Sequence, residues 1–247
     1  MSSIGRMNET DLHEQLKHLY AEGAATEHVV DGFVVDVLRD GEIIEIQTRN
    51  LNVLRKKIER LAREHRVRIV HPVAATTLIV KSDESGVVTS RRRSPKRGNQ
   101  MEAFREITRI ANLLPSPRIT VEIVMVDVVE NRSDDGRGSW RRHGVSITGR
   151  QLERVSKVIQ FTTAKDYLSV LPETLPREFT NTDLAEATGL RYRVVQPVTS
   201  ALRKMGLVRI TGKRGQSLLY APTRIRPDAL AAAEAPPRHS LQPDGQC

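Results

Sequence analysis

Apolar residues in the first part of the chain recur at two spacings, and each spacing predicts a different kind of element. Leucines at helical spacing over residues 9–23 predict a first helix, and a stripe of Leu and Ile predicts a second over 50–65. Between them, two runs rich in Val and Ile, residues 28–38 and 42–48, predict strands. The chain therefore begins with the order helix, strand, strand, helix.

Further strands, loops and helices follow. Strands are predicted over residues 66–73, 76–81 and 118–130, and polar surface loops over 90–100 and 131–144. Helices are predicted over 101–114, 149–161 and 163–171. We expect an α/β chain of the α+β kind with a mixed sheet in a domain over 1–149, a second domain over 150–222 and a disordered tail, poor in large apolar residues, over 223–247.

The first two strands are predicted to form a hairpin around Asp40-Gly41, because Asp-Gly between apolar runs is a strong turn signal. In that register Asp36 faces Glu45, and Glu45 and Gln47 point to the same side of the sheet. Two carboxylates and an amide are thus expected together inside apolar runs.

Like charges directly opposite each other destabilise a sheet, and burial strengthens the repulsion between Asp36 and Glu45. A divalent cation between the two carboxylates removes the conflict, and hard oxygen ligands suit Mg²⁺ or Mn²⁺. Two alternatives stay open: both acids can point outward to solvent, or a register shifted by one residue can separate them. The apolar character of both faces favours the metal site.

The order of elements, with Asp36 on one strand and the Glu45-x-Gln47 motif on the next, resembles the PD-(D/E)xK nuclease superfamily over residues 12–80 and more loosely to residue 130. The resemblance implies a restriction-endonuclease-like αβββαβ core that cleaves phosphodiester bonds. It also implies that Asp36 and Glu45 bind Mg²⁺, and that Gln47 helps to place the attacking water.

The resemblance further implies a contribution from an acid on the first helix, which here is Glu14, with Glu27 as a rival for that role. Gln47 stands where the superfamily has Lys, and an uncharged amide cannot act as a base. This departure leaves an inactive nuclease-like protein as an alternative. Nearly the whole chain also resembles prokaryotic proteins of unassigned activity that combine such a core with a C-terminal DNA-binding module.

Composition makes a nucleic acid the expected partner. The 247 residues carry a net charge of +9 with 28% charged residues, although a basic surface alone also explains that balance. The one cysteine, Cys247, permits no disulfide within the chain, and the seven histidines show no metal-ligand spacing. With no signal peptide or membrane-spanning apolar run, we expect a cytoplasmic protein, with no membrane partner and with a homodimer left open.

Basic residues gather in two places before residue 100. Those following Gln47, namely Arg49, Arg55, Lys56 and Lys57, are expected on a solvated helix face, in contact with phosphate or with water alone. A denser cluster in the predicted loop is expected to contact nucleic-acid phosphates without reading bases: Arg91, Arg92, Arg93, Lys96 and Arg97.

Residues 178–222 resemble a winged helix-turn-helix, with a helix capped by Thr180 or Asn181, a second helix containing Pro197, and a hairpin wing. The residues expected to contact DNA are Arg191, Arg193, Gln196 and Thr199 in the major groove and Lys213 and Arg214 on the backbone. A dimerisation or protein-docking role is the alternative for this module.

We therefore expect a Mg²⁺- or Mn²⁺-dependent DNA endonuclease tethered by a winged helix. The alternative is a catalytically inactive, nuclease-like DNA-binding regulator or architectural protein, and RNA remains open as a substrate.

Overall fold

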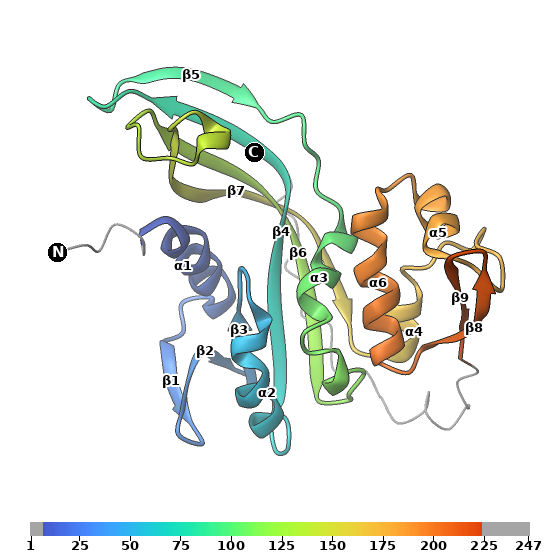
Figure 1. Ribbon diagram of the computed structural model, residues 1–247. Coiled ribbons are helices and arrows are strands. Elements are labelled where there is room, and N and C mark those ends of the chain that lie inside the picture. Colours follow the sequence, from blue (N-terminus) through green and yellow to red (C-terminus); the bar gives the residue numbers. More distant parts are fainter. Residues whose placement is uncertain (1–6, 224–247) are drawn as a thin grey trace.

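The computed structural model describes residues 7–223, and the expected tail beyond Thr223 lies outside the described residues. The first part contains helices α1, α2 and α3 and strands β1 to β7, followed by helices α4, α5 and α6 and strands β8 and β9 (Figure 1). The elements are α1 (Met7–Ala21), β1 (Thr26–Val30), β2 (Phe33–Arg39), β3 (Glu42–Ile46), η1 (Leu51–Leu54), α2 (Arg55–Leu61), β4 (Arg66–Ser82), β5 (Val88–Arg93), η2 (Gln100–Ala103), α3 (Phe104–Ile107), η3 (Ala111–Leu113), β6 (Ile119–Ser133), η4 (Trp140–Arg142), β7 (Ser146–Phe161), α4 (Ala164–Leu168), α5 (Asn181–Thr188), α6 (Tyr192–Lys204), β8 (Val208–Arg214) and β9 (Ser217–Pro222).

The large sheet is mixed, as the sequence predicts. Its strand order is β1-β2-β3-β4-β6-β7, and β5 pairs with β4. The β3–β4 and β4–β6 pairs are parallel, whereas the β1–β2, β2–β3, β4–β5 and β6–β7 pairs are antiparallel. The α+β class with a mixed sheet is therefore confirmed.

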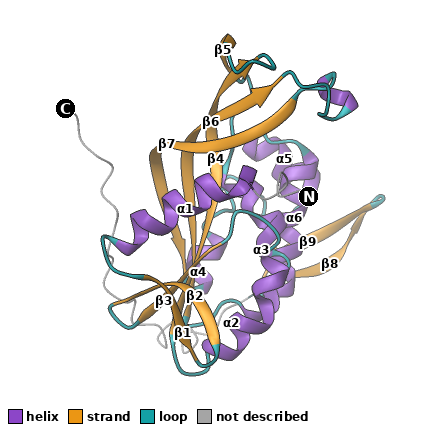
Figure 2. Cartoon of the chain, turned by 90° about the vertical axis from the view of Figure 1, so that its left-hand side faces the viewer, coloured by secondary structure: helices purple, strands orange, loops and turns teal. Residues whose placement is uncertain are grey.

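Helices cover both faces of the sheet. Helix α1 lies across one face, where Leu12, Leu16 and Tyr20 form a core with β2, β3, β4 and β6 (Figure 2). Helices α2 and α3 cover the other face through Ile58, Phe104 and their buried neighbours. Since apolar side chains on both faces are buried, the central strands β3, β4 and β6 can carry almost continuous apolar runs.

The Asp40-Gly41 hairpin forms as predicted, with Arg39 opposite Glu42 and positive φ angles of 51° and 72° in the turn. The prediction of one strand over 28–38 is wrong, because Asp31-Gly32 makes a second turn of the same kind, with φ of 49° and 78°. The run therefore folds into the β1–β2 hairpin.

The predicted helix over 149–161 is wrong, because these residues belong to strand β7. Register shifts in the β6–β7 pair leave single β7 residues unpaired, so that Leu152 pairs with Val128 and Val155 pairs with Val126. Leu152, Val155 and Val158 all pack toward α1. Bulges re-phase the side chains of a strand, and the resulting spacing of three imitates a helix.

Three smaller differences concern the middle of the chain. The predicted strands 66–73 and 76–81 are one strand, β4. The predicted loop over 90–100 begins as strand β5, which carries three of its arginines. The predicted helix over 101–114 is divided into η2, α3 and η3. Strands β4, β6 and β7 extend well past the helices and curve together with β5 (Figure 1).

The last part of the chain forms a helix pair followed by a hairpin. Thr180 caps α5 through a reciprocal bond with Asp183, as predicted, and α6 continues through Pro197. The predicted boundary between residues 149 and 150 falls inside β7, so the change to the helical part lies after Phe161. One buried core runs from the sheet through α3 to α5 and α6.

Within residues 7–223, no helix is both long and apolar enough to span a bilayer.

Candidate active site

Asp36 and Glu45 lie where strands β2 and β3 separate. The last cross-strand pair in this direction is Val37 with Ile44, so the predicted Asp36–Glu45 ladder pair is wrong. Instead, the Asp36 carboxylate turns into the ladder, and its Oδ2 accepts a hydrogen bond of 2.8 Å from the Ile46 amide. The two acids are still close enough for the charge of Asp36 to raise the pKa of Glu45.

The Asp36 carboxylate is also held from α1. Its Oδ2 lies 3.5 Å from Nε2 of His13. Burial opposes ionisation, but His13 and the Ile46 amide stabilise the carboxylate and lower the pKa of Asp36 below its ordinary value. The same contact with Asp36 raises the pKa of His13 against the effect of its burial. Asp36 is therefore an ionised, oriented carboxylate at neutral pH.

Glu45 is the buried acid of the site, with 2% of its surface exposed. Burial, with a contribution from the charge of Asp36, raises the pKa of Glu45 to about 7. Lys57 opposes this shift, because its Nζ lies 2.5 Å from Glu45 Oε1. Although this ion pair is close, Oε1 has no aligned hydrogen-bond donor among the described residues.

Lys57 approaches the site from helix α2 and is one residue that sequence analysis misplaced. It was expected on a solvated helix face, but its side chain is 16% exposed and turned toward the sheet. Its Nζ also donates a 2.5 Å hydrogen bond to the carbonyl of Val34 on β2. Lys57 thus supplies a positive charge to a site whose motif has the neutral Gln47.

Gln47 follows the end of β3. Its backbone N–H donates to the backbone carbonyl of Val70 at 2.9 Å, and its side-chain Nε2 donates to the backbone carbonyl of Arg49. His71 on β4 is buried, which lowers the pKa of its imidazole, and its Nδ1 lies 2.7 Å from Gln47 O. A neutral His71 therefore donates through Nδ1 to the backbone carbonyl of Gln47 and fixes its position. The side-chain amide of Gln47 is bound to the nearby Arg49 carbonyl.

The two candidate acids from outside the hairpin, Glu14 and Glu27, share a lysine. Nζ of Lys17 lies 2.8 Å from Glu14 and 3.0 Å from Glu27. Burial opposes the charge of Lys17, but both carboxylates hold its pKa above its ordinary value. Glu14 also lies 3.6 Å from His13. Glu14 and Glu27 are therefore placed beside the site as partners of a buried cation.

The donor set suits a hard cation at two carboxylates. Asp36 and Glu45 provide oxygen atoms, and the Glu45 Oε1 oxygen is already 2.5 Å from the Lys57 ammonium, which a cation at this oxygen would have to displace. Among residues 7–223, Asp36, Glu45 and Glu14 do not gather as three ligands within 4.8 Å of one another. The binding of Mg²⁺ or Mn²⁺ by Asp36 and Glu45 and the role of Glu14 therefore stay predictions.

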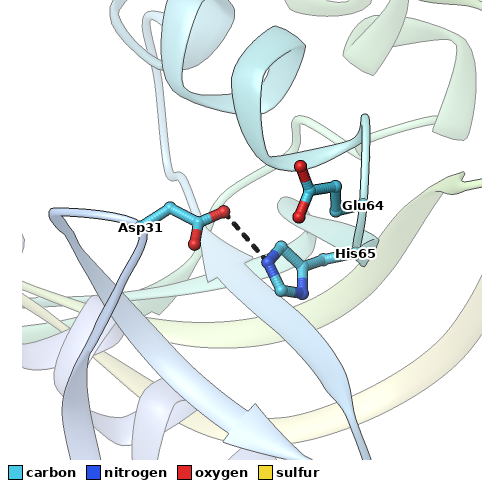
Figure 3. A group of neighbouring side chains, drawn as sticks. All are labelled: Asp31, Glu64 and His65. Carbon is cyan, nitrogen blue, oxygen red and sulfur yellow. Dashed lines mark hydrogen bonds and ion pairs between the residues drawn. The ribbon is translucent and has the colours of Figure 1, made fainter.

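A second group of ligand-type side chains connects the β1–β2 turn to the end of α2. Asp31, Glu64 and His65 each place a ligand atom within 4.8 Å of the others (Figure 3). His65 Nε2 lies 3.0 Å from Asp31 Oδ2, whereas both acids are exposed. Asp31 and His65 are far apart in the sequence, which explains why spacing alone did not reveal the group. The His65–Asp31 contact fastens the hairpin to the helix that carries Lys57.

The predicted phosphate-binding cluster is divided between a strand and a loop. Arg91, Arg92 and Arg93 are exposed on β5, opposite Val80, Ile79 and Leu78 of β4. Lys96 and Arg97 follow in the loop, where Lys96 lies 2.9 Å from Glu102 and Arg97 donates to Ser94 O at 3.1 Å.

Most of the residues predicted to contact DNA from the C-terminal helices and hairpin lie at the surface. Arg191, Arg193 and Gln196 are exposed at the start of α6, and Lys213 and Arg214 are exposed on β8, where Arg214 lies 2.9 Å from Asp183. Thr199 is 1% exposed, and its hydroxyl donates to Asn181 Oδ1 at 2.7 Å, so its prediction as a groove-facing residue is wrong.

Two comparisons with known protein sequences show the family of this chain. The profile described as "Domain of unknown function (DUF8091)" matches residues 10–162, from α1 to just after β7. A Treponema pallidum (strain Nichols) protein named "Uncharacterized protein" is 32% identical over 221 residues, which cover 88% of this chain and 87% of that protein. No solved structure matches the chain. The matched region includes Asp36, Glu45 and Lys57.

Proposed function

The chain belongs to the DUF8091 family, and we propose that the matched region is a metal-dependent nuclease site acting on DNA. The observation that carries the proposal is the pair of neighbouring acids formed by the buried Glu45 and the partly buried Asp36. One carboxylate is held ionised by His13, while burial and the charge of its neighbour raise the pKa of the other to about 7. Pairs of acids with separated pKa values are typical of catalytic sites.

Asp36 and Glu45 would hold Mg²⁺ or Mn²⁺ through oxygen atoms. When bound, such an ion polarises a phosphate and lowers the pKa of a bound water. His13 and the Ile46 amide orient Asp36, which reduces the cost of organising the site. Lys57 balances the charge of Glu45 and provides a cation where Gln47 provides none.

Two features support the nucleic-acid part of the proposal. The order of α1, β1 to β3, α2 and β4 supports the resemblance to a restriction-endonuclease-like core. The α5–α6 pair with the β8–β9 hairpin supports the winged-helix interpretation, and its exposed basic residues suit DNA. We propose the cytoplasm as the compartment and leave RNA and a homodimer as outcomes of experiment.

A second candidate function is a DNA-binding protein without catalysis. The observation that favours it is the 2.5 Å contact between Lys57 and Glu45, because the ammonium already balances the carboxylate that a metal would require. In that case Lys57 stabilises the fold without any ion. The protein would bind DNA equally well with Mg²⁺ and with a chelator.

A nicking assay on supercoiled plasmid with Mg²⁺ or Mn²⁺ separates the two candidates. We expect Asp36→Asn and Glu45→Gln each to lower the cleavage rate by at least about 100-fold, as removal of a metal ligand or its close partner does. Asp40→Asn is the matched control, since Asp40 is an exposed acid in the turn of the same hairpin.

Equal cleavage by the wild type, Asp36→Asn and Glu45→Gln would contradict the nuclease proposal. Absence of cleavage by the wild type, together with metal-independent DNA binding, would favour the second candidate. Cleavage of RNA in preference to DNA would keep the site and change the substrate.

A further inference from the structure

A groove lies between the basic loop before η2 and the first turns of α6. Its volume is about 340 Å³, and it is lined by Lys96, Glu102, Arg105, Arg193, Val194 and Pro197. The first three residues belong to the sheet-containing part of the chain, residues 7–161. The last three belong to the helical part, residues 162–223. The groove is therefore a joint product of two regions that are far apart in the sequence.

The charge of the groove is positive and largely unpaired. Lys96 and Glu102 balance each other at 2.9 Å. Arg105 and Arg193 are exposed, and neither has an ion pair within residues 7–223. Two free guanidinium groups on the walls of one groove attract an anion with repeated charges, and guanidinium groups match phosphate geometry.

The spacing of the two arginines is held by contacts between α3 and α6. The Thr108 hydroxyl donates to Pro197 O at 3.1 Å, and Lys204 Nζ donates to Thr108 O, also at 3.1 Å. Both helices contribute to one buried core. Because the two walls are fixed relative to each other, a ligand that touches both arginines does not have to bring the walls together first.

Other side chains of α6 are exposed on the same helix as Arg193. Tyr192 is 52% exposed, and Gln196 and Arg203 are also at the surface of this helix. On the other side, Glu106 of α3 accepts a 3.1 Å hydrogen bond from the Leu51 amide, which ties α3 to the segment directly after Gln47. Through this contact the wall of the groove that carries Arg105 is connected to the segment next to the candidate active site.

We infer that this groove binds the sugar-phosphate backbone of duplex DNA, with Arg105 of the sheet-containing part and Arg193 of the helical part on the same duplex. The inference rests on the proposed DNA binding and is independent of catalysis. It goes further in naming Arg105, which no motif singled out, and in making the two parts of the chain one DNA-binding surface.

Fluorescence anisotropy with a short labelled DNA duplex, repeated over a series of salt concentrations, tests the inference on the full chain. We expect Arg105→Ala and Arg193→Ala each to weaken binding and each to lower the slope of log Kd against log salt by about 1, the effect of one lost phosphate contact. The double variant should lower the slope by about 2.

The controls separate charge from folding. Arg66→Ala removes an exposed arginine at the start of β4, away from the groove, and should leave affinity and slope unchanged. Arg105→Lys and Arg193→Lys keep the charge and should retain most of the salt dependence. Circular dichroism melting of each variant checks that the fold is intact.

Four results would overturn the inference. If only Arg193→Ala has an effect, DNA contacts the helical part alone. If neither variant differs from the wild type, DNA binds elsewhere and the proposed DNA binding still stands. If the wild type does not bind duplex DNA, both fail, whereas cleavage by Asp36 and Glu45 remains separately testable. Tighter binding of duplex RNA would overturn the assignment to DNA.

Discussion

Glu45 and Glu122 are both buried carboxylates of the same sheet, yet their surroundings differ. Glu122 on β6 is 1% exposed and is fully paired: Arg68 and Gln160 each donate to its Oε2 at 2.7 Å, and the Tyr20 hydroxyl donates to Oε1. Glu45 on β3 has Lys57 beside it and one oxygen without a hydrogen bond among the described residues.

The difference separates a structural charge from a candidate functional one. A buried charge whose oxygen atoms all accept hydrogen bonds is part of a network that holds α1 and β4 to β6. The Glu45 carboxylate has one ammonium beside it, but its burial and the nearby charge of Asp36 still raise its pKa, which is typical of functional sites. The surroundings of Glu45 therefore suit the proposed ligand-binding role, whereas the hydrogen bonds of Glu122 stabilise the folded chain.

The largest effect is expected from breaking the network around Glu122. Arg68 also binds Glu42 at 2.8 Å, so Arg68→Met leaves Glu122 buried with one charged partner fewer. We expect a loss of about 3–5 kcal/mol in the free energy of unfolding, the usual cost of removing one member of a buried ion pair. Urea denaturation measures it, and Arg66→Ala on the same strand should change stability by less than about 0.5 kcal/mol. A loss under about 1 kcal/mol for Arg68→Met would show that water replaces the network.

A gain in the free energy of unfolding, instead of a loss, is expected when Glu45 is replaced by the neutral Gln. Its pKa rises from an ordinary value of 4.5 to about 7, so the folded state binds more protons between those values. The stability from this group is complete below pH 4.5 and is lost as pH rises through 7. With a chelator present, Glu45→Gln should match the wild type near pH 4.5 and exceed it by at most about 3 kcal/mol at pH 8.

Denaturation curves at several pH values provide the measurement for Glu45→Gln. Glu59→Gln, at an exposed position of α2, is the control and should follow the wild-type profile. Parallel profiles for Glu45→Gln and the wild type would mean that folding leaves the pKa of Glu45 at its ordinary value.

A smaller effect is expected from removing the cation beside Glu45. Lys57→Met leaves the carboxylate without its ion pair, so its pKa should rise further. Above pH 7 the variant should lose about 1–2 kcal/mol of stability, and near pH 5, where Glu45 is protonated, much less. Lys56→Met is the matched control, since Lys56 is exposed on the same helix. An equal loss at both pH values would indicate packing rather than charge.

The smallest effect concerns a single hydrogen bond of the network. Tyr20→Phe removes the donor to Glu122 Oε1 and leaves Arg68 and Gln160 in place. We expect a loss of about 1 kcal/mol, measured by thermal or urea unfolding. A loss as large as that of Arg68→Met would show that the tyrosine, and not the arginine, controls the network.

Local signals predicted the β2–β3 hairpin and the capped helix α5, because each depends on residues close together in the sequence. Asp40-Gly41 adopts the positive φ angles of its turn, and Thr180 bonds to Asp183 three residues later. The same turn signal at Asp31-Gly32 was overlooked. Strand β7 could not be recognised, since its spacing of three comes from bulges that exist only when it pairs with β6.

The structure brings the predicted acids Asp36 and Glu45 close together, but not in the predicted geometry, and their role as a site stays a prediction. Asp36 and Glu45 were identified from their burial in apolar runs, and their charges do interact. Their direct pairing was wrong because the Asp36 side chain takes the Ile46 amide instead of continuing the ladder. Lys57 and His13 lie on helices, and no spacing in the sequence indicates which helical side chains reach a strand.

The sequence alone determined that two carboxylates lie in an apolar hairpin, because alternation along a strand and an Asp-Gly turn are local properties. Only the tertiary structure decided what surrounds them: His13 from α1, Lys57 from α2, and a groove shared by Arg105 and Arg193. These contacts depend on how helices pack on the two faces of the sheet. That packing is set by the summed burial of many apolar side chains, and no short stretch of the chain encodes it.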